Sequence, residues 1–188
     1  MASHSIEVTE AEQPIQLLAY EFVADKAGAG KYRGGVPFRR DYKFLEAEGM
    51  LQVRSDRRDH RPFGLYGGSP GGPSENYLNP DGENRLLPSK LTMTDKGGDI
   101  FRHVLAGAGG WGDPLERDPA AVLRDVRNEL LSPAKALADY GVAIDTRAWT
   151  VDTAATLSRR AEMAKARGWT KPPTVQWHDP VLLARAAE

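Results

Sequence analysis

The sequence predicts an α+β protein in which a mainly antiparallel β domain, sandwich- or barrel-like, is followed by C-terminal helices. Short segments with strand composition fill the first 112 residues and are separated by glycine-rich stretches. Of the 19 glycines, 14 fall in residues 28–35, 64–82 and 107–112, which indicates three long connections. The character changes after "GDPLERDP", where apolar residues begin to recur at helical spacing.

Five segments have the composition of strands. They span residues 14–23, 36–45, 50–55, 90–94 and 100–105. In the second segment the two-residue period separates an aromatic face from a charged one, as in a half-buried antiparallel strand. The first face would carry Phe38, Arg40, Tyr42 and Phe44, and the other Arg39, Asp41 and Lys43.

Helix signals follow in the C-terminal third. Asp118 and Pro119 form an N-cap and first helical position, which predicts a helix over about 119–130. A second start signal at Ser132 and Pro133 predicts a helix that ends at Gly141, a glycine suited to a left-handed stop.

The remaining elements are a short strand over 142–144 and a third helix over about 152–167, ended by Gly168. We therefore expect a β-rich domain over 1–112, a helical part over 113–168 packed on it, and an extended tail over 169–188. The tail has two tryptophans, so we expect it to pack on this domain or on a partner.

Composition excludes several classes of function. The 25 Lys and Arg nearly cancel the 26 Asp and Glu, so no global field would attract nucleic acid or a membrane surface. The chain has no cysteine, which excludes disulfides and thiolate metal sites and is typical of the cytoplasm. The N-terminus is polar and acidic, unlike a signal peptide, and no apolar run is long enough to span a membrane.

No motif for a nucleotide, a metal or a nucleophile is complete. The stretch "GAGKYRGG" lacks the ending and the following helix of a phosphate-binding loop. The four histidines are far apart, so the sequence predicts no metal site of its own. "GAGGWGDP" is interpreted as a turn in which backbones approach closely.

The most charged stretch is "RSDRRDHR", at the end of the predicted strand 50–55. Its arginines could bind an anionic ligand, dock another subunit, or brace their own loop through Asp56, Asp59 and turn carbonyls. Bracing or docking is the favoured hypothesis, because the surrounding glycines and prolines create carbonyls that need donors. Candidate substrate or interface residues are Arg54, Asp56, Arg57, Arg58, Arg61, Lys90, Asp113 and Arg117, and candidate turn glycines are Gly67, Gly68, Gly107, Gly109, Gly110 and Gly112.

Read in order, these segments resemble the C-terminal part of the hydantoinase B/oxoprolinase family. The matching stretches include "IEVTEAEQPI", "GAGKYRGG", "RSDRR", "PFGLYGGSPG", "LPSK", "GGDI" and "GAGGWGDPLERDPAAVLRDVRNELLSPAKALADYGV". They cover roughly residues 5 to 145, whereas "GGVPFRRDY" and "GAGGWG" depart from the usual family patterns.

The resemblance implies a subunit of an ATP-dependent amidohydrolase that opens a cyclic amide such as a hydantoin or 5-oxoproline. It implies partners too: a hydantoinase A type subunit, which would hold ATP and Mg, and the remainder of the B-type subunit. A subunit of a ketone carboxylase (acetone or acetophenone type) and a purely structural assembly module are the alternatives. We expect this chain to bind no cofactor and to be inactive alone. Because the family's B-type subunit is several times longer, we expect a separately made, split portion of it, with a fragment as the other possibility.

Overall fold

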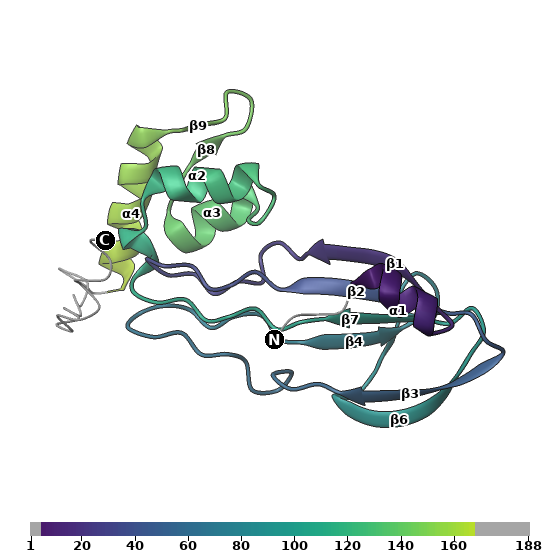
Figure 1. Ribbon diagram of the computed structural model, residues 1–188. Helices are drawn as coiled ribbons and strands as arrows, with labels where there is room; N and C mark the ends of the chain where they lie inside the picture. The colour runs from purple at the N-terminus through teal and green to yellow at the C-terminus, as the bar shows by residue number, and fades with distance from the viewer. Residues whose placement is uncertain (1–4, 168–188) are drawn as a thin grey trace, which may run out of the picture.

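The computed structural model describes residues 5–167 and has an antiparallel β part with helices at one end (Figure 1). The main sheet is open and has five strands in the order β1-β2-β7-β4-β5. Its strands are β1 (Ile15–Phe22), β2 (Phe38–Phe44), β7 (Ile100–Val104), β4 (Glu75–Leu78) and β5 (Arg85–Leu86). A separate antiparallel pair joins β3 (Glu48–Arg54) to β6 (Lys90–Lys96).

The β3-β6 pair packs on the main sheet through a shared apolar core. Leu51 and Val53 of β3 meet Leu78 of β4 and Phe101 of β7, and Leu87 completes the buried cluster. Tyr42 and Phe44 pack against it from β2, which confirms the aromatic face expected from the alternation in that strand. The arrangement is a sandwich, because the main sheet remains open at both edges and does not close into a barrel.

Beyond the strands, three glycine-rich segments run side by side as extended chain (Figure 1). Backbone hydrogen bonds join them: Gly28 donates to Ala108, Gly110 to Ser69, and Gly72 to Lys26. Trp111 forms bridges with both Tyr32 and Leu65, and Ser69 donates to Ala29, so each of the three segments contacts the other two. We call residues 26–35, 62–72 and 107–112 the glycine bundle.

Glycine is required in this bundle because the chains leave no room for a side chain. A Cβ atom at Gly71 would lie 1.8 Å from the Gly107 carbonyl oxygen, and one at Gly109 would lie 1.9 Å from that of Phe63. The expected turn glycines Gly68, Gly107 and Gly110 have similar neighbours, so most of these residues belong to closely packed extended chain rather than to tight turns.

The helical part has its own core. It contains η1 (Pro114–Glu116), α2 (Pro119–Arg127), α3 (Pro133–Tyr140), β8 (Ile144–Asp145), β9 (Thr150–Val151) and α4 (Thr153–Ala166). Val122, Ala136, Tyr140 and Val142 are almost fully buried, and Ala29 of the glycine bundle belongs to the same cluster. The helices therefore pack on the bundle rather than on the sheets.

Local chemistry explains the helix ends. Asp118 accepts from the Ala120 amide, Ser132 accepts from the Lys135 amide, and each cap precedes a proline in the first turn, as expected. Gly141 ends α3 with φ 63°, in the left-handed region predicted for it.

Several boundaries differ from expectation. α2 ends at Arg127 rather than near 130, because the chain turns there and Glu129 takes a positive φ of 58°. The strand expected over 142–144 is β8, which spans Ile144–Asp145 instead. Val142 precedes it and is buried in the helical core. The sequence interpretation missed α1 (Ile6–Glu12), β4, β5 and β9. The expected stop at Gly168 and the tail 169–188 lie outside the described residues.

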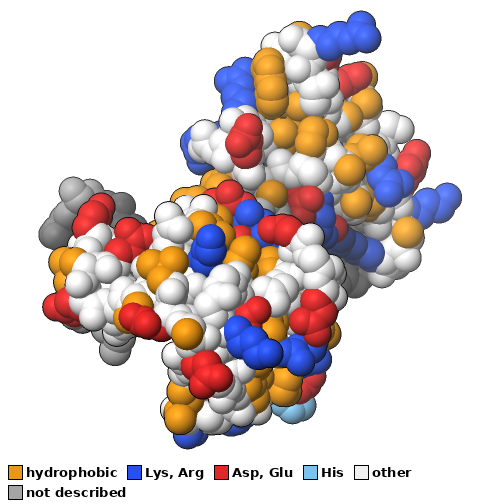
Figure 2. Space-filling model, turned by 90° about the vertical axis from the view of Figure 1, so that its right-hand side faces the viewer, with side chains coloured by type: hydrophobic (Ala, Val, Ile, Leu, Met, Phe, Trp, Pro, Cys, Tyr) orange, Lys and Arg blue, Asp and Glu red, His pale blue; other side chains and the backbone are white. Residues whose placement is uncertain are grey.

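Positive and negative side chains are interspersed on the face drawn in Figure 2, with no large area of one sign. Across residues 5–167, no helix combines the length and apolar character needed to cross a membrane.

Candidate functional site

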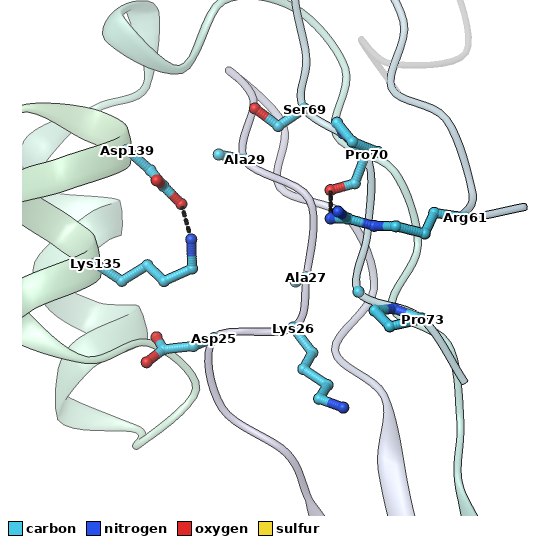
Figure 3. Close-up of a pocket in the computed structure, with 11 residues that line it drawn as sticks. Asp25, Lys26, Ala27, Ala29, Arg61, Ser69, Pro70, Pro73, Lys135 and Asp139 are labelled. Atoms are coloured by element: carbon cyan, nitrogen blue, oxygen red, sulfur yellow. Dashed lines mark hydrogen bonds and ion pairs between the residues drawn. The ribbon is translucent and has the colours of Figure 1, made fainter. Parts of the chain in front are cut away.

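A polar cavity of about 390 Å³ lies between the glycine bundle and α3 (Figure 3). Its lining combines charges from distant parts of the sequence with bundle backbone: Asp25, Lys26, Ala27, Ala29, Arg61, Ser69, Pro70, Gly72, Pro73, Lys135 and Asp139. Of the residues expected from sequence, only Arg61 belongs to it. Because three cations and two carboxylates line it, the cavity suits a polar or anionic group.

Most of these charges already have partners within the chain. Lys135 pairs with Asp139 at 2.6 Å, and Lys26 pairs at 2.6 Å with Glu75, outside the cavity lining. Asp25 accepts from the Ser132 amide at 2.7 Å and so joins the bundle to the start of α3. The cavity is therefore chiefly a junction held together by these pairs, and among the described lining residues Ser69 alone supplies a side-chain hydroxyl.

Arg61 and Arg58 act on backbone carbonyls. Arg61 Nε donates to the Gly71 carbonyl at 2.7 Å and Nη2 to that of Pro70 at 3.5 Å. Arg58 Nη1 donates to the Leu87 carbonyl at 2.7 Å. The expected ion pairs with Asp56 and Asp59 are wrong: among the described residues neither aspartate pairs with an arginine, because the guanidinium groups reach the loop carbonyls instead.

The rest of the 54–61 segment is held by β4. The Ser74 hydroxyl donates to the Asp56 carbonyl, and the Ser74 amide donates to the Arg57 carbonyl at 3.2 Å. Arg57 has φ 66°, so the chain bends sharply at this point. Asp56 pairs loosely with Lys90 at 3.7 Å, and both side chains are largely exposed, at 83% and 70%.

Asn76 is the buried centre of this region. Its side-chain amide donates to Ser55 Oγ at 2.7 Å, and its Oδ1 lies 2.6 Å from His103 Nδ1. Burial, followed by the nearby Arg40 guanidinium, lowers the pKa of His103 below its usual range. The neutral ring can then serve as donor to Asn76, which ties the 54–61 segment to β4 and β7.

Arg54 and Lys90 lie elsewhere, opposite one another at the end of the β3-β6 pair. They line a shallow hollow of about 210 Å³ together with Gln52 and Thr92, and do not reach the polar cavity.

Asp113 and Arg117 belong to a buried ionic junction between the bundle and the helices. Arg117 Nη2 donates to Asp125 Oδ2 at 2.8 Å, and Arg33 Nε reaches the same oxygen at 3.1 Å. Asp113 caps η1 through the Leu115 amide and accepts from Arg167 at 2.8 Å. These contacts hold the segments in place.

Tyr140 lies under this junction. The Arg117 guanidinium sits over its ring at 6.0 Å from the centroid. Burial raises the pKa of Tyr140 to about 12, so its phenol stays protonated at neutral pH. Arg160 closes the junction by donating to the carbonyls of Tyr140 and Arg117.

The stretches "GAGKYRGG" and "GAGGWGDP" do not have the backbone arrangement of a loop that binds a nucleotide phosphate. A phosphate loop presents unengaged backbone amides, but here the amides of Gly28, Lys31, Tyr32 and Gly34 all donate to carbonyls of the bundle. The amides of Gly107, Ala108 and Gly110 do the same. Within residues 5–167, no group of three or more His, Cys, Asp or Glu could hold a metal ion.

Sequence reasoning named Arg58 and Arg61 but missed Asp25, Lys26, Lys135 and Asp139. The four-residue spacing of Lys135 and Asp139 was a signal for a helical ion pair. No local signal marks Asp25, because its importance depends on the distant start of α3.

Comparison with known proteins gives one family match and several similar proteins and structures. Residues 1–114 match the family described as hydantoinase B/oxoprolinase. An uncharacterised protein of Methanocaldococcus jannaschii is 42% identical over 139 residues, covering 74% of this chain and 24% of that protein. A crystal structure of an ATP-dependent caprolactamase from Pseudomonas jessenii is similar, with TM-score 0.72 and 30% identity over 85% of this chain and 28% of that one.

A nucleotide-free structure of acetone carboxylase has the same fold, with TM-score 0.73 and 23% identity over 93% of this chain and 28% of that one. The chain thus spans about a quarter of the length of these relatives. The family match covers residues 1–114, which is more than half of the sequence and includes the β part and the glycine bundle. This chain therefore belongs to the hydantoinase B/oxoprolinase family.

Proposed function

We propose that this chain is a small subunit, equivalent to the C-terminal portion of a B-type subunit, of an ATP-dependent amidohydrolase that opens a cyclic amide. The observation that carries this proposal is the likeness to the ATP-dependent caprolactamase structure, at 30% identity over 85% of the chain. A lactam, a hydantoin and 5-oxoproline share a cyclic amide bond, so we take that bond as the substrate class.

In this proposal the chain contributes structure and contacts rather than bond breaking. Many backbone amides of the glycine bundle, among them those of Gly28, Gly34 and Gly110, donate to neighbouring carbonyls, which supports placing ATP and Mg on a hydantoinase A type subunit. The remainder of the B-type subunit is the second partner, because the chain spans about a quarter of its relatives. The absence of cysteine is consistent with an assembly that works in the cytoplasm.

Two alternatives have support. The acetone carboxylase likeness, at 23% identity, supports a shared fold and keeps a ketone carboxylase as the second candidate. A purely structural module is supported by the internal pairing of Lys26, Lys135 and Asp25 in the polar cavity.

Reconstitution tests the proposal. The chain is coexpressed with a hydantoinase A type subunit and the remainder of a B-type subunit, and ADP release and ring opening are measured with hydantoin, 5-oxoproline and caprolactam. We expect ADP release that depends on a cyclic amide, needs no bicarbonate, and is lost when this chain is omitted.

Other outcomes separate the alternatives. ADP release that requires both a ketone and bicarbonate would identify a carboxylase. Full activity without this chain would contradict an enzymatic role. A further variant replaces every charged side chain of the polar cavity by a neutral one. If its assembly and turnover equal those of the wild-type complex, the structural module is favoured.

A further inference from the structure

A second pocket, at the opposite end of the sandwich from α2, α3 and α4 (Figure 1), contains a buried carboxyl group without a hydrogen-bond partner among the described residues. Asp95 of β6 is 0% exposed, and among the described residues neither of its oxygens has a hydrogen-bond partner. It lines a cavity of about 240 Å³ with the chain before β1, the end of β2 and the start of β3. A buried carboxyl group whose two oxygens have no hydrogen-bond partner is costly, so this group calls for a ligand.

The position of Asp95 follows from the alternation of β6. Leu91 and Met93 point toward the sandwich core, and Asp95 continues that inward row where an apolar residue would ordinarily stand. Opposite it lies Gly49, where a Cβ atom would come within 2.9 Å of Asp95 Oδ2. The glycine therefore leaves space around the carboxylate.

The same chain shows how a buried aspartate is ordinarily satisfied here. Asp41 is also buried, and both of its oxygens accept from one guanidinium, that of Arg102, at 2.8 and 2.7 Å. Asp95 likewise has two carboxyl oxygens that can accept, and among the described residues no guanidinium donates to them. A fork of two parallel N–H donors is the group that fits them best.

The surroundings favour a cationic side chain of a protein. Glu46 and Glu48 line the same pocket and add negative charge. Met50, 80% exposed, and Phe44 supply apolar lining suited to a methylene stem. A metal ion is a poorer fit, since within residues 5–167 no cluster of three or more ligating side chains forms.

We propose that this pocket is a socket for an arginine side chain from the remainder of the B-type subunit. The pocket's affinity for arginine stands on its own geometry, whereas the identity of the partner rests on the proposed function. This chain matches only 24% of one relative and 28% of another, and the rest of the longer protein provides a source for that side chain.

The first experiment uses the full chain alone. N-acetylarginine amide at millimolar concentrations should shift the backbone amide resonances of Gly49 and Asp95 in NMR spectra, and the uncharged isostere N-acetylcitrulline amide should not. The Asp95→Asn variant should lose this response and raise Tm by about 2–4 °C, because a buried acidic group without a hydrogen-bond partner is replaced by a side chain that cannot ionise. Asp59→Asn, at an exposed carboxylate, is the matched control and should change neither.

The second experiment measures assembly with the coexpressed remainder of the B-type subunit. Asp95→Asn should weaken association at least tenfold, and Asp59→Asn should leave it within twofold. Absence of any arginine-specific shift, a lower Tm for Asp95→Asn, or unchanged association would overturn the socket. If the wild-type chain itself fails to associate, the proposed function fails, while the NMR experiment still decides whether the pocket binds arginine.

Discussion

Asp41 and Arg102 face each other across β2 and β7 and form a two-pronged ion pair, with Nε to Oδ1 at 2.8 Å and Nη2 to Oδ2 at 2.7 Å. Both side chains are largely withdrawn from solvent. The hydrogen bonds that Arg102 donates to Asp41 raise the pKa of Arg102 despite the opposing effect of burial. The pair links two neighbouring strands of the main sheet, on the face opposite the sandwich core.

We predict that Asp41→Asn destabilises the chain by about 3–5 kcal/mol, because it leaves the mostly buried Arg102 guanidinium with only the exposed Asp81, 3.8 Å away, as a counter-ion. Urea denaturation of the isolated chain measures this. Lys90→Ala is the control: its pair with Asp56 is largely exposed and should contribute only about 0–1 kcal/mol. Equal losses in the two variants would contradict the interpretation.

The close packing of the glycine bundle predicts different effects on stability for two glycine substitutions. Gly71→Ala should destabilise the chain by more than about 3 kcal/mol, because the new methyl group would lie 1.8 Å from the Gly107 carbonyl oxygen. Gly35→Ala is the matched control in the same bundle. Its methyl group would meet only the Ala108 side chain at 3.7 Å, so stability should change by less than about 1 kcal/mol. Thermal melting followed by circular dichroism distinguishes them.

Elements with a regular side-chain period could be predicted from sequence. β2 alternates visibly, and α2 and α3 carry capping residues and prolines that mark their starts. β4 could not be predicted, since it has only four residues and its strand form depends on hydrogen bonding to β7 and β5. Which strands pair depends on residues far away in the sequence, so the local pattern of β4 does not predict its strand form.

The candidate sites show the same limit. Arg58 and Arg61 were identifiable by their charge, but their acceptors are carbonyls of Leu87 and Gly71, which carry no side-chain signal. Asp95 was missed altogether, because a single aspartate in a strand reveals its burial only when the opposing Gly49 and the core are in place.

We predict that the isolated chain does not bind Mg-ATP at micromolar concentrations. The physical reason is that the amides of Gly28, Gly34 and Gly110, with others of the same segments, already donate to neighbouring carbonyls, so no continuous row of free amides is left for a phosphate. Calorimetric titration of the pure chain measures this, with the reconstituted complex as the positive control. Micromolar binding to the chain alone would contradict the proposed division of roles.

The free energy of unfolding should fall as the pH is lowered below about 6.5, because of the lowered pKa of His103. Burial and Arg40 lower the pKa of His103 below 6.5, so the unfolded chain takes up this proton first. The stabilisation is complete above about pH 6.5 and declines below it, by at most about 1.4 kcal/mol per pH unit for one proton.

Urea denaturation between pH 7 and pH 5 measures this slope. His103→Gln keeps a donor for Asn76 but cannot take up a proton, so it should flatten the slope. His60→Gln, at an exposed position, should leave the slope as in the wild-type chain. An unchanged slope in His103→Gln would assign the pH dependence to other groups.

The arginines of the 54–61 segment should affect stability and assembly before they affect turnover. Arg58→Ala removes a charged donor from the Leu87 carbonyl and should cost about 1.5–3 kcal/mol, whereas exposed Arg54→Ala should stay within about 0.5 kcal/mol. Arg61→Ala should lie between them, because its guanidinium is bonded to Gly71 but more exposed. Melting temperature and turnover per assembled complex are measured together. A variant that assembles with wild-type stability and yet loses turnover would place that arginine in the active site, since bracing alone acts only through the amount of folded complex.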